Sequence, residues 1–185
     1  VEGCQVLVVG VGGIGRAIGR MLGAVGCRVQ GVGRSARSGD GDFSAIYASE
    51  DLYQVLADAD YVVAAAPLTD KTRGLFGAKQ FATMKQSARF INIGRGALVN
   101  ETALVEALQQ QQIAGAALDV FETEPLPLDS PLWDLENVIV SPHMSGDYDG
   151  HQVTVVQVFL DNLHRFRHGE PLLNRVDKRL GFVTD

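Results

Sequence analysis

Cysteine is scarce in this chain of 185 residues, where only Cys4 and Cys27 are present. Two cysteines are too few for the disulfide framework of a small secreted domain, and neither has a partner at a metal-binding spacing. No apolar run approaches the roughly 20 residues that span a bilayer, and no basic-then-apolar leader opens the sequence. We therefore predict no metal site and no membrane contact, and we expect a soluble, cytoplasmic protein.

Positive charge is also in short supply. The chain carries 16 lysines and arginines against 22 aspartates and glutamates, which gives a formal net charge of −6. Nucleic-acid affinity depends on many distributed phosphate contacts, so we predict no nucleic-acid partner. Against this background Arg28, Arg34 and Arg37 form a local excess of positive charge. We expect this group to meet a small, local anion.

Apolar runs and helical patterns alternate along the chain. Short apolar runs predict strands at residues 6–9, 29–32, 61–66, 90–93, 116–120 and 138–140. Apolar residues at helical spacing predict helices at residues 14–25, 51–57, 81–85, 101–111 and 151–166. We expect Asn100 to cap the fourth helix and Gly169 to end the last. The alternation predicts the α/β class, with a doubly wound parallel sheet and right-handed crossovers.

The segment GVGGIG follows the first predicted strand and opens the first predicted helix. It places Gly10, Gly12 and Gly15 in the G-x-G-x-x-G pattern of Rossmann-type dinucleotide-binding domains. The first glycine permits a tight turn, the second lets the backbone approach a pyrophosphate, and the third lets helix and strand pack closely. The amides of Gly13 and Ile14 would bind the pyrophosphate at the helix N-terminus. The alternative is a glycine-rich loop that binds nothing.

The second predicted strand ends without the acidic residue that NAD-binding domains use. That residue holds the adenosine ribose hydroxyls about 20 positions after the glycines, and here the position is Gly33. Arg34, Ser35 and Arg37 follow it, and a guanidinium suits the geometry of a phosphate. We predict that these three residues bind the 2′-phosphate of NADP(H), the preferred cofactor, with NAD(H) possible. A solvated loop with arginines placed by chance is the alternative.

Three more segments place polar side chains directly after apolar strands. Arg95 lies in INIGRGALV, Glu124 in GAALDVFETEPL and His143 in VIVSPHMSG. Because ligands of open α/β sheets bind at the carboxyl ends of the strands, we expect these side chains to converge. Arg95 is suited to grip a carboxylate or carbonyl oxygen, and His143 to exchange a proton near neutral pH. Taken singly, each residue could instead have a structural role.

These segments together resemble the cofactor-binding domain of the D-isomer-specific 2-hydroxyacid dehydrogenases. The matching text, in family order over about residues 6–146, is VVGVGGIGRAIG, ADYVVAAAPLTDKTRGLF, INIGRGALVNETALVEAL, AGAALDVFETEPL and NVIVSPHMSG. The resemblance implies an oxidoreductase that transfers a hydride between a nicotinamide cofactor and a 2-oxo acid or D-2-hydroxy acid. The basic segment after the second strand is similar to that of the NADPH-preferring glyoxylate/hydroxypyruvate reductases of the family.

The resemblance also implies a role for each matching residue. Arg95 would orient the 2-oxo acid, His143 would be the proton donor and acceptor, and Glu124 would tune that histidine. Asp119 would contact the nicotinamide carboxamide. The other residues expected to line the cofactor are Pro67, Thr72, Ile93, Gly94, Ser145 and Gly146.

Family members carry an N-terminal substrate domain before the first strand, and this chain starts at that strand. We therefore expect a dinucleotide-binding domain at residues 1–148, and a helix and tail at residues 149–185 that would return to a substrate domain this chain lacks. By resemblance we expect a homodimer that acts on a small 2-oxo or 2-hydroxy acid, with little turnover from the chain alone. The alternative function is a non-enzymatic, dinucleotide-sensing interaction protein of the corepressor type.

Two features need a separate interpretation. Gln112 stands at a helix end where the family usually has glycine, so we expect a left-handed, non-glycine cap there at a cost of about 1 kcal/mol. His164 and His168 share a helix face, but the sequence offers no third metal ligand. We interpret them, with Arg165 and Arg167, as a cationic last turn that complements the helix dipole.

Overall fold

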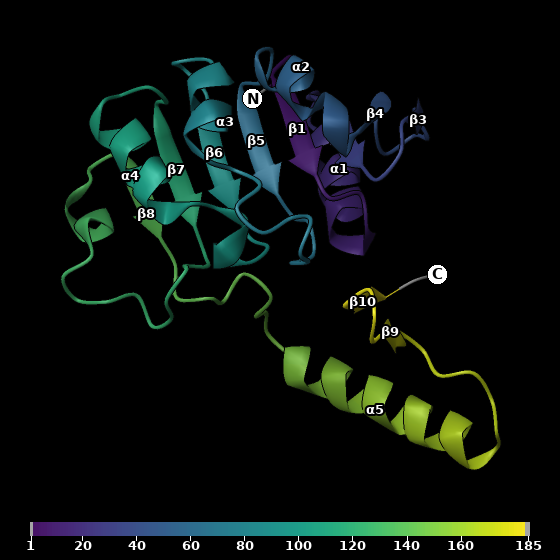
Figure 1. Ribbon diagram of the computed structural model, residues 1–185. Helices are drawn as coiled ribbons and strands as arrows, with labels where there is room; N and C mark the ends of the chain where they lie inside the picture. Colours follow the sequence, from purple (N-terminus) through teal and green to yellow (C-terminus); the bar gives the residue numbers. More distant parts are fainter. Residues whose placement is uncertain (1, 184–185) are drawn as a thin grey trace. The chain divides into compact units, whose positions relative to one another are not determined.

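The computed structural model describes residues 2–183 (Figure 1). Contacts divide the chain into two units, of which the first reaches His143 and the second starts at Met144. The domain boundary predicted after residue 148 falls within the second unit. All three residues predicted to be catalytic belong to the first unit, so their mutual geometry can be described directly.

One eight-stranded sheet forms the first unit, with the strand order β3-β4-β2-β1-β5-β6-β7-β8. Its strands are β1 (Gln5–Val9), β2 (Arg28–Gly33), β3 (Arg37–Ser38), β4 (Ala45–Ala48), β5 (Tyr61–Ala64), β6 (Arg89–Asn92), β7 (Gly115–Leu118) and β8 (Val138–Val140). Neighbouring strands are parallel except for β3 and β4, which pair antiparallel. The predicted parallel, doubly wound α/β sheet is therefore confirmed.

Helices connect these strands. They are α1 (Gly13–Ala24), α2 (Leu52–Leu56), α3 (Ala78–Thr83) and α4 (Glu101–Gln109), with 3-10 turns η1 (Ser49–Asp51), η2 (Gly96–Leu98) and η3 (Pro131–Asp134). Asn100 caps α4 as predicted, because its side-chain oxygen accepts a hydrogen bond of 3.0 Å from the amide of Ala103.

The side chains of β1 point alternately to the two faces of the sheet, so this one strand contributes to two hydrophobic clusters. Leu7 and Val9 join the larger cluster, which includes buried side chains of α2, α3 and α4. Val6 and Val8 join the smaller cluster, against which Ile18 of α1 packs. Successive side chains of a strand point to opposite faces, so both faces of β1 are buried and every position from 6 to 9 is apolar.

The strand order reverses at β1, which pairs with β2 on one side and with β5 on the other. The chain builds one edge of the sheet after β1 and then returns to build the other edge. In sheets of this kind the connections from the central strands diverge, and a crevice forms at the carboxyl ends of the strands. The glycine turn lies at the carboxyl end of β1, at the edge where this crevice forms.

Three elements, β3, β4 and α3, differ from those that the sequence pattern predicts. The pattern predicts no strand between residues 33 and 51, yet β3 and β4 lie there. Strand β4 has four residues, of which only alternate ones are buried, so its apolar signal is short. Helix α3 starts at Ala78 and ends at Thr83, whereas the pattern predicts residues 81–85. The Gln80 side chain accepts a hydrogen bond from the Gly77 amide, which fixes the earlier start.

The left-handed residue after α4 is Gln111, with φ +53°, and not Gln112 as predicted. The helix ends two residues earlier than predicted, at Gln109, with Gln110 as its C-cap. The amide of Gln112 then donates to the Ala107 carbonyl, and the amide of Gln111 donates to the Leu108 carbonyl. These two bonds form a Schellman motif, which requires the left-handed conformation at the residue directly after the C-cap.

The described part of the second unit contains α5 (His151–Arg167) and the antiparallel pair β9 (Val176–Asp177) and β10 (Phe182–Val183). None of the α5 side chains is buried. The chain turns just after the helix at Gly169, which has φ +69° and ends the helix as predicted. Within residues 2–183, no helix combines the length and the apolar character needed to cross a membrane.

Phe90 should be a main contributor to stability. Its side chain is fully buried, and its ring centroid lies 4.8 Å from that of Phe76 and 5.4 Å from that of Phe81. We expect Phe90→Ala to lower the free energy of unfolding by about 3–5 kcal/mol, measured by urea denaturation. Leu128, which is 97% exposed, is the control: Leu128→Ala should change it by less than about 0.5 kcal/mol. Equal losses would contradict the assignment of the core.

Candidate active site

The three glycines of the first turn differ in what surrounds them. Gly10 has φ +111°, and a Cβ there would lie 2.5 Å from the carbonyl carbon of Ala65. A Cβ on Gly15 would overlap the carbonyl oxygen of Gly10, so helix and strand pack with no room for a side chain. By contrast, a Cβ on Gly12 or Gly13 would meet no heavy atom within 4 Å. The packed glycines shape the turn, and the open ones leave the backbone accessible to a ligand.

Helix α1 starts inside this turn. Gly12 is its N-cap, and no side chain forms a capping hydrogen bond at this N-terminus. Gly13 and Ile14 are exposed. The first amides of a helix have no partner within the helix, and the helix dipole favours an anion beside them. The turn therefore fits the pyrophosphate of a dinucleotide: its backbone can be approached and its donors lie at a helix N-terminus.

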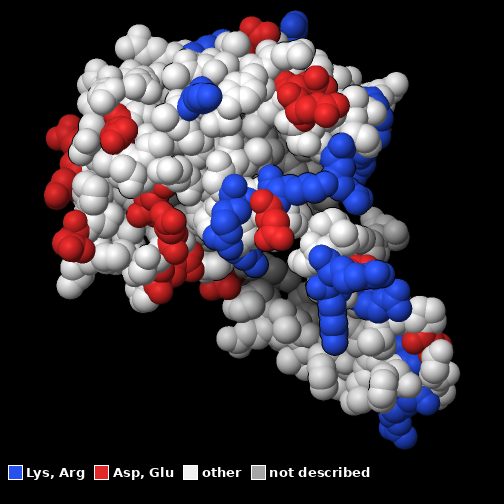
Figure 2. Space-filling view, viewed as in Figure 1, with Lys and Arg blue, Asp and Glu red and all other residues white. Residues whose placement is uncertain are grey.

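The residues predicted to bind a 2′-phosphate lie at the edge of the sheet, directly after β2. Arg34, Ser35 and Arg37 are all exposed, and Arg37 begins β3, where it pairs with Ile46 of β4. Gly33 stands at the carboxyl end of β2, and a Cβ there would lie 2.8 Å from a methyl group of Val11. In the view of Figure 2, basic side chains gather near this edge, whereas acidic ones gather over the opposite, α4 edge.

A buried asparagine holds the loop that carries Arg95. Asn92, at the end of β6, is 1% exposed. Its side-chain nitrogen donates to the Arg95 carbonyl at 3.1 Å, and its side-chain oxygen accepts from the Gly94 amide at 3.1 Å. The sequence pattern alone gives no prediction for this residue, although an asparagine in an otherwise apolar predicted strand is a signal of such a role. The exposed Arg95 guanidinium donates to the Gly94 carbonyl at 2.7 Å.

The loops after β6 and β7 pack backbone against backbone. Gly96 is buried, and a Cβ there would overlap the carbonyl of Phe121. Next to this contact, the amide of Glu122 donates to a carboxylate oxygen of Glu101 at 3.0 Å. The amide of Phe121 donates to Glu124 at 3.0 Å. The Arg95 loop and the Glu124 loop are thus held together by direct backbone packing of Gly96 against Phe121.

Glu124, in the loop after β7, contacts His143, in the loop after β8. Oε2 of Glu124 lies 2.7 Å from Nδ1 of His143. An ionised carboxylate can only accept a hydrogen bond, so Nδ1 carries the proton and donates it. The other ring nitrogen, Nε2, then stands on the side of the ring away from Glu124. This contact brings together two of the three side chains that the sequence analysis expects to converge.

Nearby charges and donors hold the pKa of Glu124 below its ordinary value. The hydrogen bond with His143 has the largest effect, followed by the hydrogen bond from the Phe121 amide, while burial acts in the opposite direction. The positive charge of Arg95 also lowers this pKa. Arg95 therefore lies close enough to the pair to act on it electrostatically, and the carboxylate is ionised at neutral pH.

His143 has an unusual backbone conformation. Its φ is +55°, in the left-handed region that non-glycine residues rarely adopt. The amide of His143 donates to the Ser141 carbonyl at 3.1 Å, which closes a tight turn after β8. Conformations of this kind cost of order 1–3 kcal/mol and concentrate at functional sites. The turn aims the imidazole at Glu124 instead of letting the strand continue.

Other predicted cofactor residues lie at the same edge of the sheet. Asp119, after β7, is 4% exposed and accepts a hydrogen bond from the Ser141 hydroxyl, a partner that the sequence analysis missed. Pro67 and Thr72 share the loop after β5, where the Thr72 hydroxyl donates to the Pro67 carbonyl at 2.6 Å. Ile93 follows β6, and its amide donates to the carbonyl of Ala64.

The last two predicted residues, Ser145 and Gly146, belong to the second unit. Their predicted contacts with the cofactor therefore stay predictions. The same holds for the roles of the residues above: the geometry joins Glu124 to His143, and the charge of Arg95 acts on Glu124.

Comparison with known proteins identifies the family. Residues 1–145 match the model of the D-isomer specific 2-hydroxyacid dehydrogenase family, NAD binding domain. The chain belongs to this family. The resemblance of its segments to these dehydrogenases is thereby confirmed, and so is the Rossmann-type fold.

Individual relatives of this dehydrogenase domain agree with the match. Glyoxylate/hydroxypyruvate reductase B of Citrobacter koseri is 51% identical over 113 residues, which are 61% of this chain and 35% of that protein. A D-isomer specific 2-hydroxyacid dehydrogenase from Xanthobacter autotrophicus Py2, solved with NADPH and MES, has a TM-score of 0.87 at 40% identity and covers 97% of this chain and 56% of its own.

A second solved structure is the NADPH-dependent glyoxylate/hydroxypyruvate reductase of Sinorhizobium meliloti, in complex with NADP and sulfate. Its TM-score is 0.87 at 35% identity, and the match covers 98% of this chain and 58% of that one. This dehydrogenase domain thus spans about half the length of the relatives it matches.

The lowered pKa of Glu124 predicts how stability depends on pH. A carboxylate whose pKa is lower in the folded state stabilises the fold above its unfolded pKa, about 4.5, and loses that effect as the pH falls through the folded pKa. We expect Glu124→Gln to melt below the wild-type temperature at pH 7, with the gap shrinking below pH 4.5. Thermal melts between pH 7 and pH 3 measure this.

The matched control is Glu136→Gln, which removes one exposed carboxylate outside the contacts described above. A gap for Glu124→Gln that widened toward acid pH would contradict the assigned direction of the pKa shift.

Proposed function

We propose that this chain is the cofactor-binding part of an oxidoreductase that transfers a hydride between NADP(H) and a small 2-oxo acid or D-2-hydroxy acid. The observation that carries the proposal is the Glu124–His143 pair, with Arg95 close enough to act on it, at the edge of the sheet where the glycine turn begins α1. The family membership and the names of the relatives support the same reaction class.

The residues fit a dinucleotide. Gly12 and Gly13 leave their backbone open, so the pyrophosphate would lie against the start of α1. Asp119 and the backbone of Ile93 and Gly94 would line the nicotinamide. When bound, the nicotinamide supplies or accepts the hydride at the carbon that carries the oxygen.

The protein's own groups would handle the oxygen and its proton. Arg95 is the exposed guanidinium of the site, suited to bind the substrate carboxylate and to stabilise negative charge on the reacting oxygen. His143 would give its Nε2 proton to that oxygen during reduction and take it back during oxidation. Glu124 would act through His143, because its carboxylate fixes the ring orientation and stabilises the protonated ring.

A preference for NADP(H) follows from the end of β2. Gly33 offers no carboxylate for the ribose hydroxyls, and Arg34, Ser35 and Arg37 offer two guanidinium groups and a hydroxyl for the 2′-phosphate. Two of the solved relatives were obtained with NADPH or NADP. NAD(H) would be the weaker cofactor.

The whole protein would need more than this chain. Hydride transfer requires exclusion of water, and a second domain would have to close over the site. We therefore propose low turnover for the chain alone and full activity for a longer, cytoplasmic protein that pairs as a homodimer. The alternative of a corepressor-type sensor draws no support from the relatives named above, which are reductases and dehydrogenases.

An activity assay tests the proposed function. The full-length protein should oxidise NADPH in the presence of one or more of glyoxylate, hydroxypyruvate, pyruvate and phenylpyruvate. His143→Gln should lower kcat by roughly 10²-fold or more with little change in NADPH affinity, because proton transfer is lost while the cofactor site is kept. Tight NADPH binding without turnover of any 2-oxo acid would favour the sensor instead.

Substitutions at the carboxyl end of β2 should shift cofactor selectivity from NADPH toward NADH. Because Val11 fills the space beside Gly33, the carboxylate is best introduced with room made for it, in the triple variant Val11→Ala, Gly33→Asp and Arg34→Ala. We expect its NADPH/NADH ratio of kcat/KM to fall about tenfold or more, since a hydrogen bond to a charged group is worth about 1.5–3 kcal/mol. Val11→Ala alone is the control, and an unchanged ratio in the triple variant would rule out this 2′-phosphate site.

A further inference from the structure

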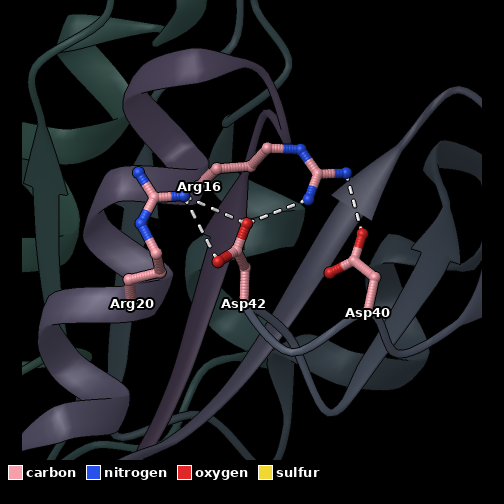
Figure 3. A network of polar contacts seen from close by, with 4 residues as sticks. All are labelled: Arg16, Arg20, Asp40 and Asp42. Atoms are coloured by element: carbon pink, nitrogen blue, oxygen red, sulfur yellow. Dashed lines mark hydrogen bonds and ion pairs between the residues drawn. The ribbon is translucent and has the colours of Figure 1, made fainter.

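An ion-pair network ties α1 to the loop between β3 and β4 (Figure 3). Arg16, in the first turn of α1, donates from Nη2 to Asp40 at 2.8 Å and from Nη1 to Asp42 at 3.0 Å. Arg20, one turn further along the helix, lies 3.3 Å from both carboxylate oxygens of Asp42. One guanidinium thus connects two carboxylates of a single loop with the helix whose N-terminus is the proposed pyrophosphate site.

The backbone of this loop lies directly against the helix. A Cβ on Gly19 would lie 2.5 Å from the Asp42 carbonyl oxygen, so the helix can approach the loop only because residue 19 is glycine. The loop turns tightly, with the Asp40 amide donating to the Phe43 carbonyl at 3.1 Å. Phe43 itself is 3% exposed in the smaller hydrophobic cluster. The positions of Asp40 and Asp42 are therefore fixed by packing as well as by charge.

The same stretch of chain carries the proposed 2′-phosphate ligands. Arg34 and Arg37 stand at its start, and Asp40 and Asp42 follow three and five residues after Arg37. Taken alone, the two arginines and two aspartates sum to a net charge of zero, which gives a phosphate dianion no net attraction. Both aspartates therefore work against the proposed site unless their charge is compensated.

Arg16 and Arg20 of α1 compensate the negative charge of the two aspartates. The Arg16 hydrogen bond holds the pKa of Asp40 below its ordinary value. Asp40 therefore keeps its negative charge at neutral pH, and protonation does not remove that charge. Adding Arg16 and Arg20 changes the local balance to four arginines against two aspartates, a net charge of +2. That balance matches the charge of a 2′-phosphate dianion.

We propose that Arg16 is a selectivity-determining positioning residue: by pairing with Asp40 and Asp42 it cancels their charge, so that Arg34 and Arg37 attract a 2′-phosphate that Arg16 itself does not touch. This inference rests on the proposed preference for NADP(H). It assigns to a residue of the helix that follows the glycine turn a role in distinguishing two cofactors that have the same pyrophosphate.

The test uses two small probes that isolate the 2′-phosphate. Adenosine 2′,5′-bisphosphate and AMP differ only in that group, and calorimetric titration of the full-length protein gives a Kd for each. We expect Arg16→Gln to weaken binding of the bisphosphate about fivefold and of AMP less than about twofold, as unscreened carboxylates repel the added charge. Arg89→Gln, at an exposed position at the amino end of β6, is the matched control for the loss of one arginine.

A rescue experiment tells whether Arg16 acts by compensating the charge of the aspartates or only by holding the loop in place. Removing the carboxylates as well, in Arg16→Gln with Asp40→Asn and Asp42→Asn, should restore the bisphosphate Kd to within about twofold of wild type. No rescue, or an equal loss for both probes, would overturn the proposal. Should Arg16→Gln not fold, Asp40→Asn alone decides: it leaves surplus positive charge and should tighten bisphosphate binding, and weaker binding would contradict the proposal.

A further variant distinguishes failure of this inference from failure of the proposed cofactor preference. Arg34→Ala with Arg37→Ala should abolish the advantage of the bisphosphate over AMP. If that advantage survives, the 2′-phosphate site itself is wrong. If it disappears while Arg16→Gln retains wild-type selectivity, the site stands and only the role of Arg16 is refuted.

Discussion

Close backbone approach is the constraint on which the site depends. Gly96 lies against the Phe121 carbonyl with no space for a Cβ, and Gly15 lies in the same way against the Gly10 carbonyl. Each contact brings two loops, or a loop and a helix, closer than any side chain would permit. The Arg95 loop, the Glu124 loop and the glycine turn are consequently held by main-chain packing, and their functional side chains start from fixed positions.

Buried polar side chains also fix the conformation of the loops that carry the site. Asn92 and Asp119 are both buried near the ends of their strands; Asn92 is hydrogen-bonded to the loop that follows it, and Asp119 to Ser141 after β8. A buried polar group without a partner is costly, so such residues specify one loop conformation strongly. The left-handed turn at His143 is the third device, because it redirects the chain after β8 toward Glu124.

Helix α1 serves two parts of one ligand in the proposed function. Its N-terminus would hold the pyrophosphate, and Arg16 in its first turn pairs with the loop that follows the proposed 2′-phosphate ligands. One rigid element would thereby set the distance between the two proposed phosphate sites. The chain spans about half of its relatives, so the proposed substrate domain would have to bring the acid to a cofactor already placed by this unit.

The sequence by itself determined the parallel sheet, the glycine turn, the family and the pairing of Glu124 with His143, since apolar periodicity and short motifs are local properties of the chain. Only the tertiary structure decided that Asn92 holds the Arg95 loop, that Gln111 is the left-handed residue, and that Asp40 and Asp42 belong with Arg16. The Arg16 ion pairs join residues 24 and 26 positions apart, and the left-handed residue depends on where α4 ends. The Asn92 hydrogen bonds span only two and three positions, but the burial that makes them necessary comes from the packed sheet. Packing brings such groups together, and no local pattern records it.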